Sequence, residues 1–143
     1  MSATVKESYF WKQVKAGLED TETDLCRIEN VAGTGIFDVN ACRRGREAWI
    51  ELKVFHGRKI YFRNSQRSWA VRRSKVGGRA LVLVRNDDAL FLHSAVAVVD
   101  AKSTPGNDGK SFSVDVSDLP TPLFACAKPF KWSALREAIF ESS

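Results

Sequence analysis

Three charged residues lie in two segments that otherwise have the composition of apolar β-strands. Asp38 interrupts the segment IFDVNA, and Glu51 and Lys53 interrupt the segment AWIELKVF. A plain sheet would place core or solvent-facing residues in a regular alternation here. The two acids and the lysine are therefore the first candidates for a functional site.

An antiparallel hairpin between these segments would bring the three side chains together. With Arg44 and Gly45 as a two-residue turn, Asp38 lies directly opposite Glu51, with Cβ atoms about 4.5–5.5 Å apart. Lys53 then shares their face, about 6.7 Å further along the strand. A one-residue slip or a longer loop would break this arrangement. We expect the apolar neighbours to turn the other way, toward the core: Phe37, Val39, Ile50, Leu52 and Val54.

Two opposed carboxylates repel each other unless a proton or a cation lies between them. Carboxylate oxygens without histidine or thiol ligands favour Mg²⁺, with Mn²⁺ able to substitute. Such a metal beside a basic surface indicates phosphodiester hydrolysis, in which the metal polarises the phosphate and activates a water. Lys53 would orient that water or stabilise the developing negative charge. The alternative is a structural ion pair on an exposed sheet face, because the pattern D…ExK is short and common.

The middle of the sequence is strongly basic. Residues 43–85 contain 13 Lys or Arg and 2 Asp or Glu, whereas the remainder contains 9 basic and 15 acidic residues. A basic middle in an acidic frame is typical of a protein that binds a polyanion, and a solvated basic face is the alternative. The residues that we expect to contact nucleic acid are Arg43, Arg44, Arg46, Arg63, Arg67, Arg72, Arg73 and Lys75.

Length and composition limit the remaining possibilities. The 143 residues, 44% of them hydrophobic, fit one compact domain. Three widely spaced cysteines without a CxxC pair argue against a disulfide framework or a zinc knuckle. Free thiols suit a reducing cytosol, so we expect a cytoplasmic location, which is the host cytoplasm if the protein is viral. No apolar run approaches the ~18 residues of a membrane span, and the first residues lack a signal pattern.

The hydrophobic pattern predicts a mixed α/β domain with the order α-β-β-β-α-β-β(β)-α. The predicted helices cover residues 5–18, with a capping box formed by Thr4 and Glu7, and residues 64–78 and 133–140. The predicted strands cover residues 25–31, 36–41, 48–55, 59–62 and 80–85, with one or two more in 89–100. We expect a loop at 102–110 and a mostly irregular segment at 118–130.

The segments RIENVAGTGIFDVN and WIELKV resemble the PD-(D/E)xK nuclease signature. They are similar to virus-type replication-repair (VRR-NUC) nucleases and to small archaeal-type and phage Holliday-junction resolvases. The resemblance implies a single restriction-endonuclease-like domain over 1–143, with an α-β-β-β-α-β core in about 5–100 and an extension in 101–143. It also implies that Asp38, Glu51 and the backbone carbonyl of Leu52 bind the metal and that Lys53 assists catalysis. One departure is Phe37, which stands where the signature has proline.

The same resemblance suggests three further site residues. Gln66 opens the second predicted helix, where related nucleases often carry a catalytic glutamine; the alternative is an ordinary first-turn residue. Glu7 lies where these nucleases place an additional metal-binding acid, although it also completes the predicted capping box. Glu29 is the competing metal ligand, and its alternative is an exposed acid paired with Arg27. The GTG at 33–35 lacks the spacing of a nucleotide-binding loop and is read as permitting a tight approach or a turn before Asp38.

The predicted function is a metal-dependent, structure-specific DNA endonuclease, of which a Holliday-junction resolvase is the first reading. Its partners would be branched or double-stranded DNA and a second copy of the chain, because junction resolvases of this superfamily are homodimers. The alternatives are a flap, single-strand, restriction-type or other repair nuclease, a non-catalytic DNA-binding module of nuclease fold, and a scaffold with an incidental basic surface. The apolar segment 119–132 would be either core cover or a dimer face.

Overall fold

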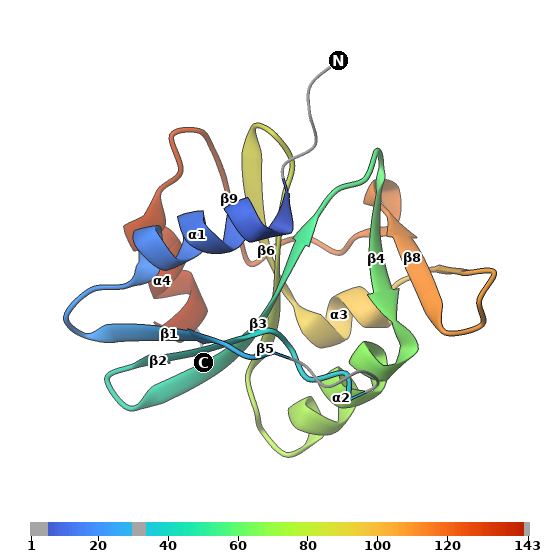
Figure 1. Cartoon of the computed structure of the whole chain (residues 1–143), viewed down its shortest axis with the longest axis horizontal. Coiled ribbons are helices and arrows are strands. Elements are labelled where there is room, and N and C mark those ends of the chain that lie inside the picture. The colour runs from blue at the N-terminus through green and yellow to red at the C-terminus, as the bar shows by residue number, and fades with distance from the viewer. Residues whose placement is uncertain (1–5, 30–33, 142–143) are drawn as a thin grey trace.

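The computed structural model describes residues 6–29 and 34–141. Six strands form a central sheet in the order β1-β2-β3-β5-β6-β9, and three strands form a second sheet in the order β4-β8-β7 (Figure 1). The strands of the central sheet are β1 Thr23–Arg27, β2 Val39–Arg43, β3 Arg46–Val54, β5 Ala80–Arg85, β6 Ala89–Ser94 and β9 Phe124–Ala127. Those of the second sheet are β4 Lys59–Arg63, β7 Thr104–Pro105 and β8 Ser111–Asp115.

Both faces of the central sheet are covered, so the protein has two hydrophobic core clusters. The helices are α1 Glu7–Leu18, α2 Asn64–Lys75, α3 Ala95–Val99 and α4 Trp132–Glu141, with a short 3-10 helix at Val116–Asp118. Helices α1 and α4 pack on one face of the sheet. Helices α2 and α3 and the second sheet pack on the other (Figure 1). No helix in the described part of the chain is long and apolar enough to cross a membrane.

The predicted hairpin and its register are confirmed. Strands β2 and β3 pair from Val39–Ile50 to Arg43–Arg46, which leaves Arg44 and Gly45 as the turn. These two residues have φ angles of 50° and 80°, the left-handed values that a type I′ turn requires at both central positions. The register therefore brings the next residue before β2 opposite Glu51.

The predicted orientation is wrong for one of the five apolar neighbours of Asp38, Glu51 and Lys53. Val39, Ile50, Leu52 and Val54 enter the core under α1 and α4 as expected. Phe37 instead packs in the other cluster, with its ring centroid 4.7 Å from that of Trp69 on α2. The physical reason is that β2 starts only at Val39, so strand alternation does not hold two residues earlier.

Several predicted boundaries differ from the structure. The first helix begins at Glu7 with Lys6 as N-cap and no side-chain cap bond, so the capping box is wrong, and Thr4 lies outside the described residues. The strand predicted for 25–31 is shifted toward the N-terminus, and its last two residues also lie outside the described part. The strand at 80–85 is confirmed as β5, which is buried at every position as a strand covered on both faces should be.

The second sheet and the C-terminal third contain the larger differences. The fourth predicted strand leaves the central sheet, because the turn at Gly57, with φ 62°, sends β4 away to pair with β8. The second half of 89–100 is helix α3, since Ala95, Val98 and Val99 are buried at helical spacing. Strand β8 was not predicted, and β9 lies in the segment predicted to be mostly irregular. From the apolar segment 119–132, the structure packs four residues against the core, as the core-cover alternative expects: Phe124, Cys126, Phe130 and Trp132.

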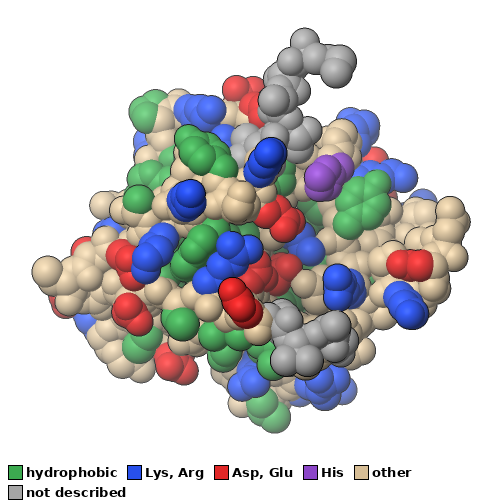
Figure 2. All heavy atoms as spheres, in the orientation of Figure 1, with side chains coloured by type: hydrophobic (Ala, Val, Ile, Leu, Met, Phe, Trp, Pro, Cys, Tyr) green, Lys and Arg blue, Asp and Glu red, His purple; other side chains and the backbone are tan. Residues whose placement is uncertain are grey.

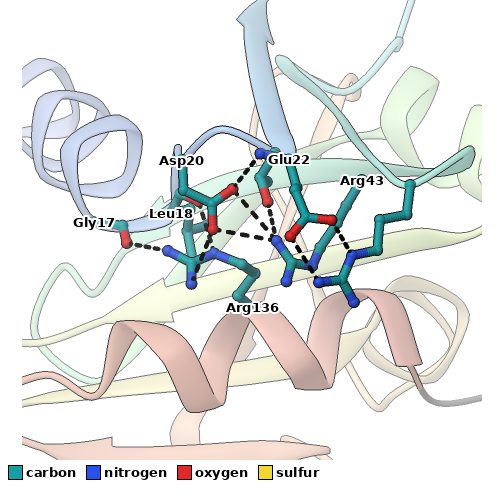
Figure 3. A network of polar contacts seen from close by, with 8 residues as sticks. Gly17, Leu18, Asp20, Glu22, Arg43 and Arg136 are labelled. Carbon is teal, nitrogen blue, oxygen red and sulfur yellow. Dashed lines mark hydrogen bonds and ion pairs between the residues drawn. The ribbon is translucent and has the colours of Figure 1, made fainter.

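A polar network joins the end of α1 to α4 and to the hairpin (Figure 3). Arg136 donates from Nε to the Leu18 carbonyl at 2.8 Å and from Nη2 to the Gly17 carbonyl at 3.0 Å. Its Nη1 lies 3.5 Å from Asp20 Oδ2, and Arg43 Nη1 lies 3.2 Å from the same oxygen. The last carbonyls of a helix have no hydrogen-bond donors within that helix. Arg136, on α4, supplies the donors for these carbonyls of α1.

We expect Arg136→Ala to lower the free energy of unfolding by about 1–3 kcal/mol, because two partly buried carbonyls and Asp20 lose a charged donor. The measurement is urea denaturation followed by circular dichroism. Glu137→Ala, on the exposed side of the same helix, should change stability by less than about 0.5 kcal/mol. Equal destabilisation by the two variants would contradict a specific role for the guanidinium.

Candidate active site

A hollow of about 930 Å³ opens between the N-terminus of α1, the β2–β3 pair and the start of α2. All six residues whose side chains were predicted to form the site line it: Glu7, Glu29, Asp38, Glu51, Lys53 and Gln66. Figure 2 shows this face, with acidic side chains near its middle and Lys and Arg side chains around them. The structure thus brings together residues that are up to 59 positions apart in the sequence, from Glu7 to Gln66.

Asp38 and Glu51 meet at the point where β2 begins. The Asp38 backbone N–H donates to Glu51 Oε1 at 3.2 Å. Burial raises the pKa of the Asp38 carboxyl to about 9, and the hydrogen bond and the negative charge of Glu51 add to this effect, while Lys53 opposes it. Without a cation, the pair therefore keeps one proton near neutral pH, which is the behaviour expected of two carboxyls that share one site.

The other oxygen of Glu51 is held by a lysine and a glutamine. Gln66 Nε2 donates to Glu51 Oε2 at 2.7 Å, and Lys53 Nζ lies 3.3 Å from the same oxygen. Gln66 Oε1 accepts from the Arg63 backbone N–H at 3.0 Å and from Lys53 Nζ at 3.5 Å. The ammonium of Lys53 also lies 4.7 Å from the centre of the Phe62 ring, a cation–π contact. Each polar group is thus fixed from two sides.

Gly35 permits the close approach that joins the two halves of the site. Its φ is +74°, and a Cβ at this position would lie 2.0 Å from the Ser65 carbonyl oxygen at the start of α2. Of the tight approach or turn that the sequence predicted before Asp38, the close approach is confirmed on this residue. The contact holds the segment leading into Asp38 against the helix that carries Gln66.

The donors available to a metal are oxygens. In the ranges that the structure describes, no three or more His, Cys, Asp or Glu side chains are grouped to hold a metal, so Glu7 and Glu29 line the hollow without joining the pair. Trp49 N–H bonds toward β5, so by strand alternation the Leu52 carbonyl points to the β2 side, beyond the last β2–β3 pair. Two carboxylates and one carbonyl fit Mg²⁺, which keeps several waters in protein sites.

The predicted nucleic-acid contacts separate into two places. Arg63 lines the hollow, and Arg72 and Lys75 are exposed on α2. Arg67 is bound to the Val99 carbonyl and to Ser103 Oγ. Arg67 is thus engaged within the protein, whereas Arg72 and Lys75 are exposed. Phosphate binding by α2 stays a prediction.

The other four arginines are engaged with protein groups. Arg73 lies over the rings of Trp49 and Trp69. At the hairpin turn, Arg43 pairs with Asp20, Arg44 pairs with Glu22, and Arg46 donates to the Phe140 carbonyl. This turn is five residues along β2 from Asp38, about 17 Å away. It therefore lies outside the candidate active site.

Among the residues that line the same hollow and that sequence reasoning did not assign to the site are Arg27, Tyr61 and Ser111. Arg27 was considered only as a partner for Glu29. The signal for Tyr61 was present in KIYFR, where Lys59, Tyr61 and Arg63 alternate with two apolar residues. The pairing of Ser111 with Arg63 across β8 and β4 has no local signal, because it joins residues 48 positions apart.

Comparison with known proteins identifies a shared fold. The structure of Hjc, a Holliday junction resolvase from the archaeal hyperthermophile Archaeoglobus fulgidus, matches with a TM-score of 0.51 at 19% sequence identity. The match covers 80% of this chain and 84% of Hjc. No protein-family model and no curated protein matches the chain. The predicted fold class is confirmed: the chain has a restriction-endonuclease-like α/β fold with a mixed central sheet, while the virus-type replication-repair part of the resemblance stays a prediction.

We expect Asp38→Asn to stabilise the metal-free protein at pH 8 and to flatten its pH dependence. An unfolded Asp ionises near pH 3.9, whereas folded Asp38 holds its proton to a pH of about 9. Between these values the folded state binds more protons, so wild-type stability falls as pH rises. Thermal unfolding at pH 5 and pH 8 in EDTA measures this. The melting temperature of the variant should exceed that of the wild type by a few degrees at pH 8 and by less at pH 5.

Mg²⁺ should raise the melting temperature of the wild type at pH 8, because a ligand that binds only the folded state stabilises it, and should leave that of Asp38→Asn nearly unchanged. Asp115→Asn is the control, since this carboxylate lies on the second sheet and its pKa is lowered, first by a hydrogen bond from the Ser117 backbone. If the stability of the wild type in EDTA rose from pH 5 to pH 8, this would contradict the raised pKa of Asp38.

We expect Gly35→Ala to destabilise the protein and to weaken metal binding, because its Cβ would overlap the Ser65 carbonyl and its φ is positive. Gly77→Ala, just past the end of α2, is the matched control: its φ is +85° with nothing within 4 Å of the added Cβ. Both variants carry the backbone strain, and only the first carries the overlap. Calorimetric titration with Mn²⁺ should show weaker binding for Gly35→Ala alone, and equal affinities would rule out the positioning role.

Proposed function

We propose that the protein is a metal-dependent, structure-specific DNA endonuclease that resolves four-way (Holliday) junctions. The observation that carries the proposal is the Asp38–Glu51 pair, in which Glu51 is buried and Asp38 half-buried, with Lys53 and Gln66 on the second carboxylate. Without a bound cation, this pair keeps one proton near neutral pH. Such a pair is suited to bind a divalent cation in place of the proton. The fold shared with Hjc supports the choice of DNA as substrate, and of a junction among DNA structures.

Asp38, Glu51 and the Leu52 carbonyl would hold Mg²⁺, which supplies the charge that polarises a phosphate and activates a water. Lys53 lies 3.3 Å from Glu51, so its ammonium faces the same space and can stabilise negative charge on the phosphate. Gln66 fixes the rotamer of Glu51 through its amide. Arg27 and Arg63 both line the hollow and would position the DNA backbone without reading its sequence.

A four-way junction has two-fold symmetry, and paired cuts require two active sites, which is why we propose a homodimer. The proposed nuclease domain comprises residues 1–143, with its core in about 5–100. Glu7 and Glu29 line the hollow and remain candidates for a further water-mediated metal contact. The three cysteines are free, and we infer a reducing, cytoplasmic location from them.

We expect Glu51→Ala and Lys53→Ala each to reduce cleavage by at least about 100-fold, the loss typical of removing one group that stabilises developing charge, while junction binding stays within a few-fold of wild type. The assay uses end-labelled four-way junction, flap, single strand and plain duplex of matched sequence. Mg²⁺, Mn²⁺ and EDTA are compared for each substrate. Glu137→Ala is the control variant, because its side chain is exposed on α4 outside the hollow.

Symmetric nicking of the junction alone, lost in EDTA, supports the resolvase. Preferential cutting of the flap or the single strand would move the function to repair processing and retain the active site. Tight binding without cleavage in either metal would favour a non-catalytic DNA-binding module. Full activity of Glu51→Ala or Lys53→Ala would show that the site is assigned to the wrong residues.

A further inference from the structure

The outer face of the second sheet is a basic surface with an aromatic ring at its centre. Along β4, Ile60 and Phe62 are buried in the core, whereas Lys59, Tyr61 and Arg63 are exposed. Tyr61 is 49% exposed, which is unusual for a tyrosine in the middle of a paired strand. The strand thus presents cation, aromatic ring and cation in one row.

The neighbours of Tyr61 leave its ring accessible and fix its position. Across the sheet it faces the short side chain of Ser113, and about half of the tyrosine stays exposed. On the other side His56 makes an edge-to-face contact, with ring centroids 5.9 Å apart and planes at 64°. His56 is held in turn by a two-way backbone pairing with Lys59. The ring is therefore presented on a rigid hairpin.

This face runs directly into the candidate active site. Tyr61, Arg63 and Ser111, all from the second sheet, line the same hollow as Asp38 and Glu51. Arg63 immediately precedes α2, and its backbone N–H bonds to Gln66. A nucleic-acid strand whose phosphate reaches the carboxylate pair would therefore pass over β4.

We propose that Tyr61 stacks an unpaired nucleotide of the DNA strand beside the phosphate that is cut, with Lys59 and Arg63 binding the flanking phosphates. The proposal rests on the proposed nuclease function and specifies its substrate. An aromatic platform between cations is how proteins bind single strands without reading sequence. A base pair inside a duplex cannot present its face to this ring, so the site selects a strand whose base is unstacked at a branch point, flap or end.

The first measurement separates docking from cleavage. Single strands carrying the fluorescent adenine analogue 2-aminopurine at successive positions are titrated with the protein in EDTA, where no cutting occurs. Stacking on Tyr61 should quench the fluorescence at one position. Tyr61→Phe should retain the quench, and Tyr61→Ala should lose it with about tenfold weaker binding, the effect of removing one base–aromatic stack. Tyr9→Ala is the control, since this α1 tyrosine is 55% exposed and does not line the hollow.

The second measurement uses Mg²⁺ and a junction with one unpaired nucleotide at the branch point, beside the same junction with an abasic residue there. The loss of cutting in Tyr61→Ala should be about tenfold on the first substrate and much smaller on the second. Equal quenching and cutting by wild type and Tyr61→Ala would overturn the inference and leave the nuclease intact. A wild-type quench that requires Tyr61, without cleavage of any DNA, would overturn the nuclease proposal and support the stacking role.

Discussion

Two carboxyl groups share one partly buried position in this protein, and the surrounding structure is arranged to hold them there. Asp38 and Glu51 face each other because the Arg44–Gly45 turn sets the register of β2 and β3. Their repulsion is reduced by a proton on Asp38 and by Lys53 and Gln66 on Glu51. Such a pair lowers the stability of the metal-free protein. A bound cation would restore that stability.

The two core clusters explain how a protein of this size can hold two carboxyl groups together despite their repulsion. The pair lies on a sheet that is packed on both faces, and Glu51 is only 5% exposed. Strand β3 has β2 on one side and the fully buried β5 on the other, so the side chains of the pair cannot move apart without disturbing the central sheet. A rigid strand is a better support for a metal site than a loop, because catalysis depends on displacements below an ångström.

The hairpin, the candidate site and β5 could be predicted from the sequence because each depends on local rules: a two-residue turn, strand alternation and a continuous apolar run. Phe37 was misplaced because alternation was applied beyond the end of a strand. Helix α3 reads as a strand, since its valines favour sheet, and only its packing against the core makes it helical. The second sheet depends on β4 pairing with β8, residues about 50 positions later, and no pattern within either strand indicates its partner.

The distribution of charge shows most clearly that the sequence alone does not tell which cations are available at the site. The basic run at 43–85 suggested one binding surface, yet its first arginines are paired with Asp20 and Glu22, acids from the part of the chain that had seemed a separate acidic frame. Net charge along the sequence therefore overstates the cations available at the hairpin. Among the residues that the structure describes, the cations that line the hollow with the carboxylate pair are Arg27, Lys53 and Arg63, and of these Arg63 alone belongs to the arginines that the sequence favoured. A DNA strand at this site would meet the exposed ring of Tyr61 between Lys59 and Arg63, so its selection would depend on the shape of the strand as well as on the charge of its backbone.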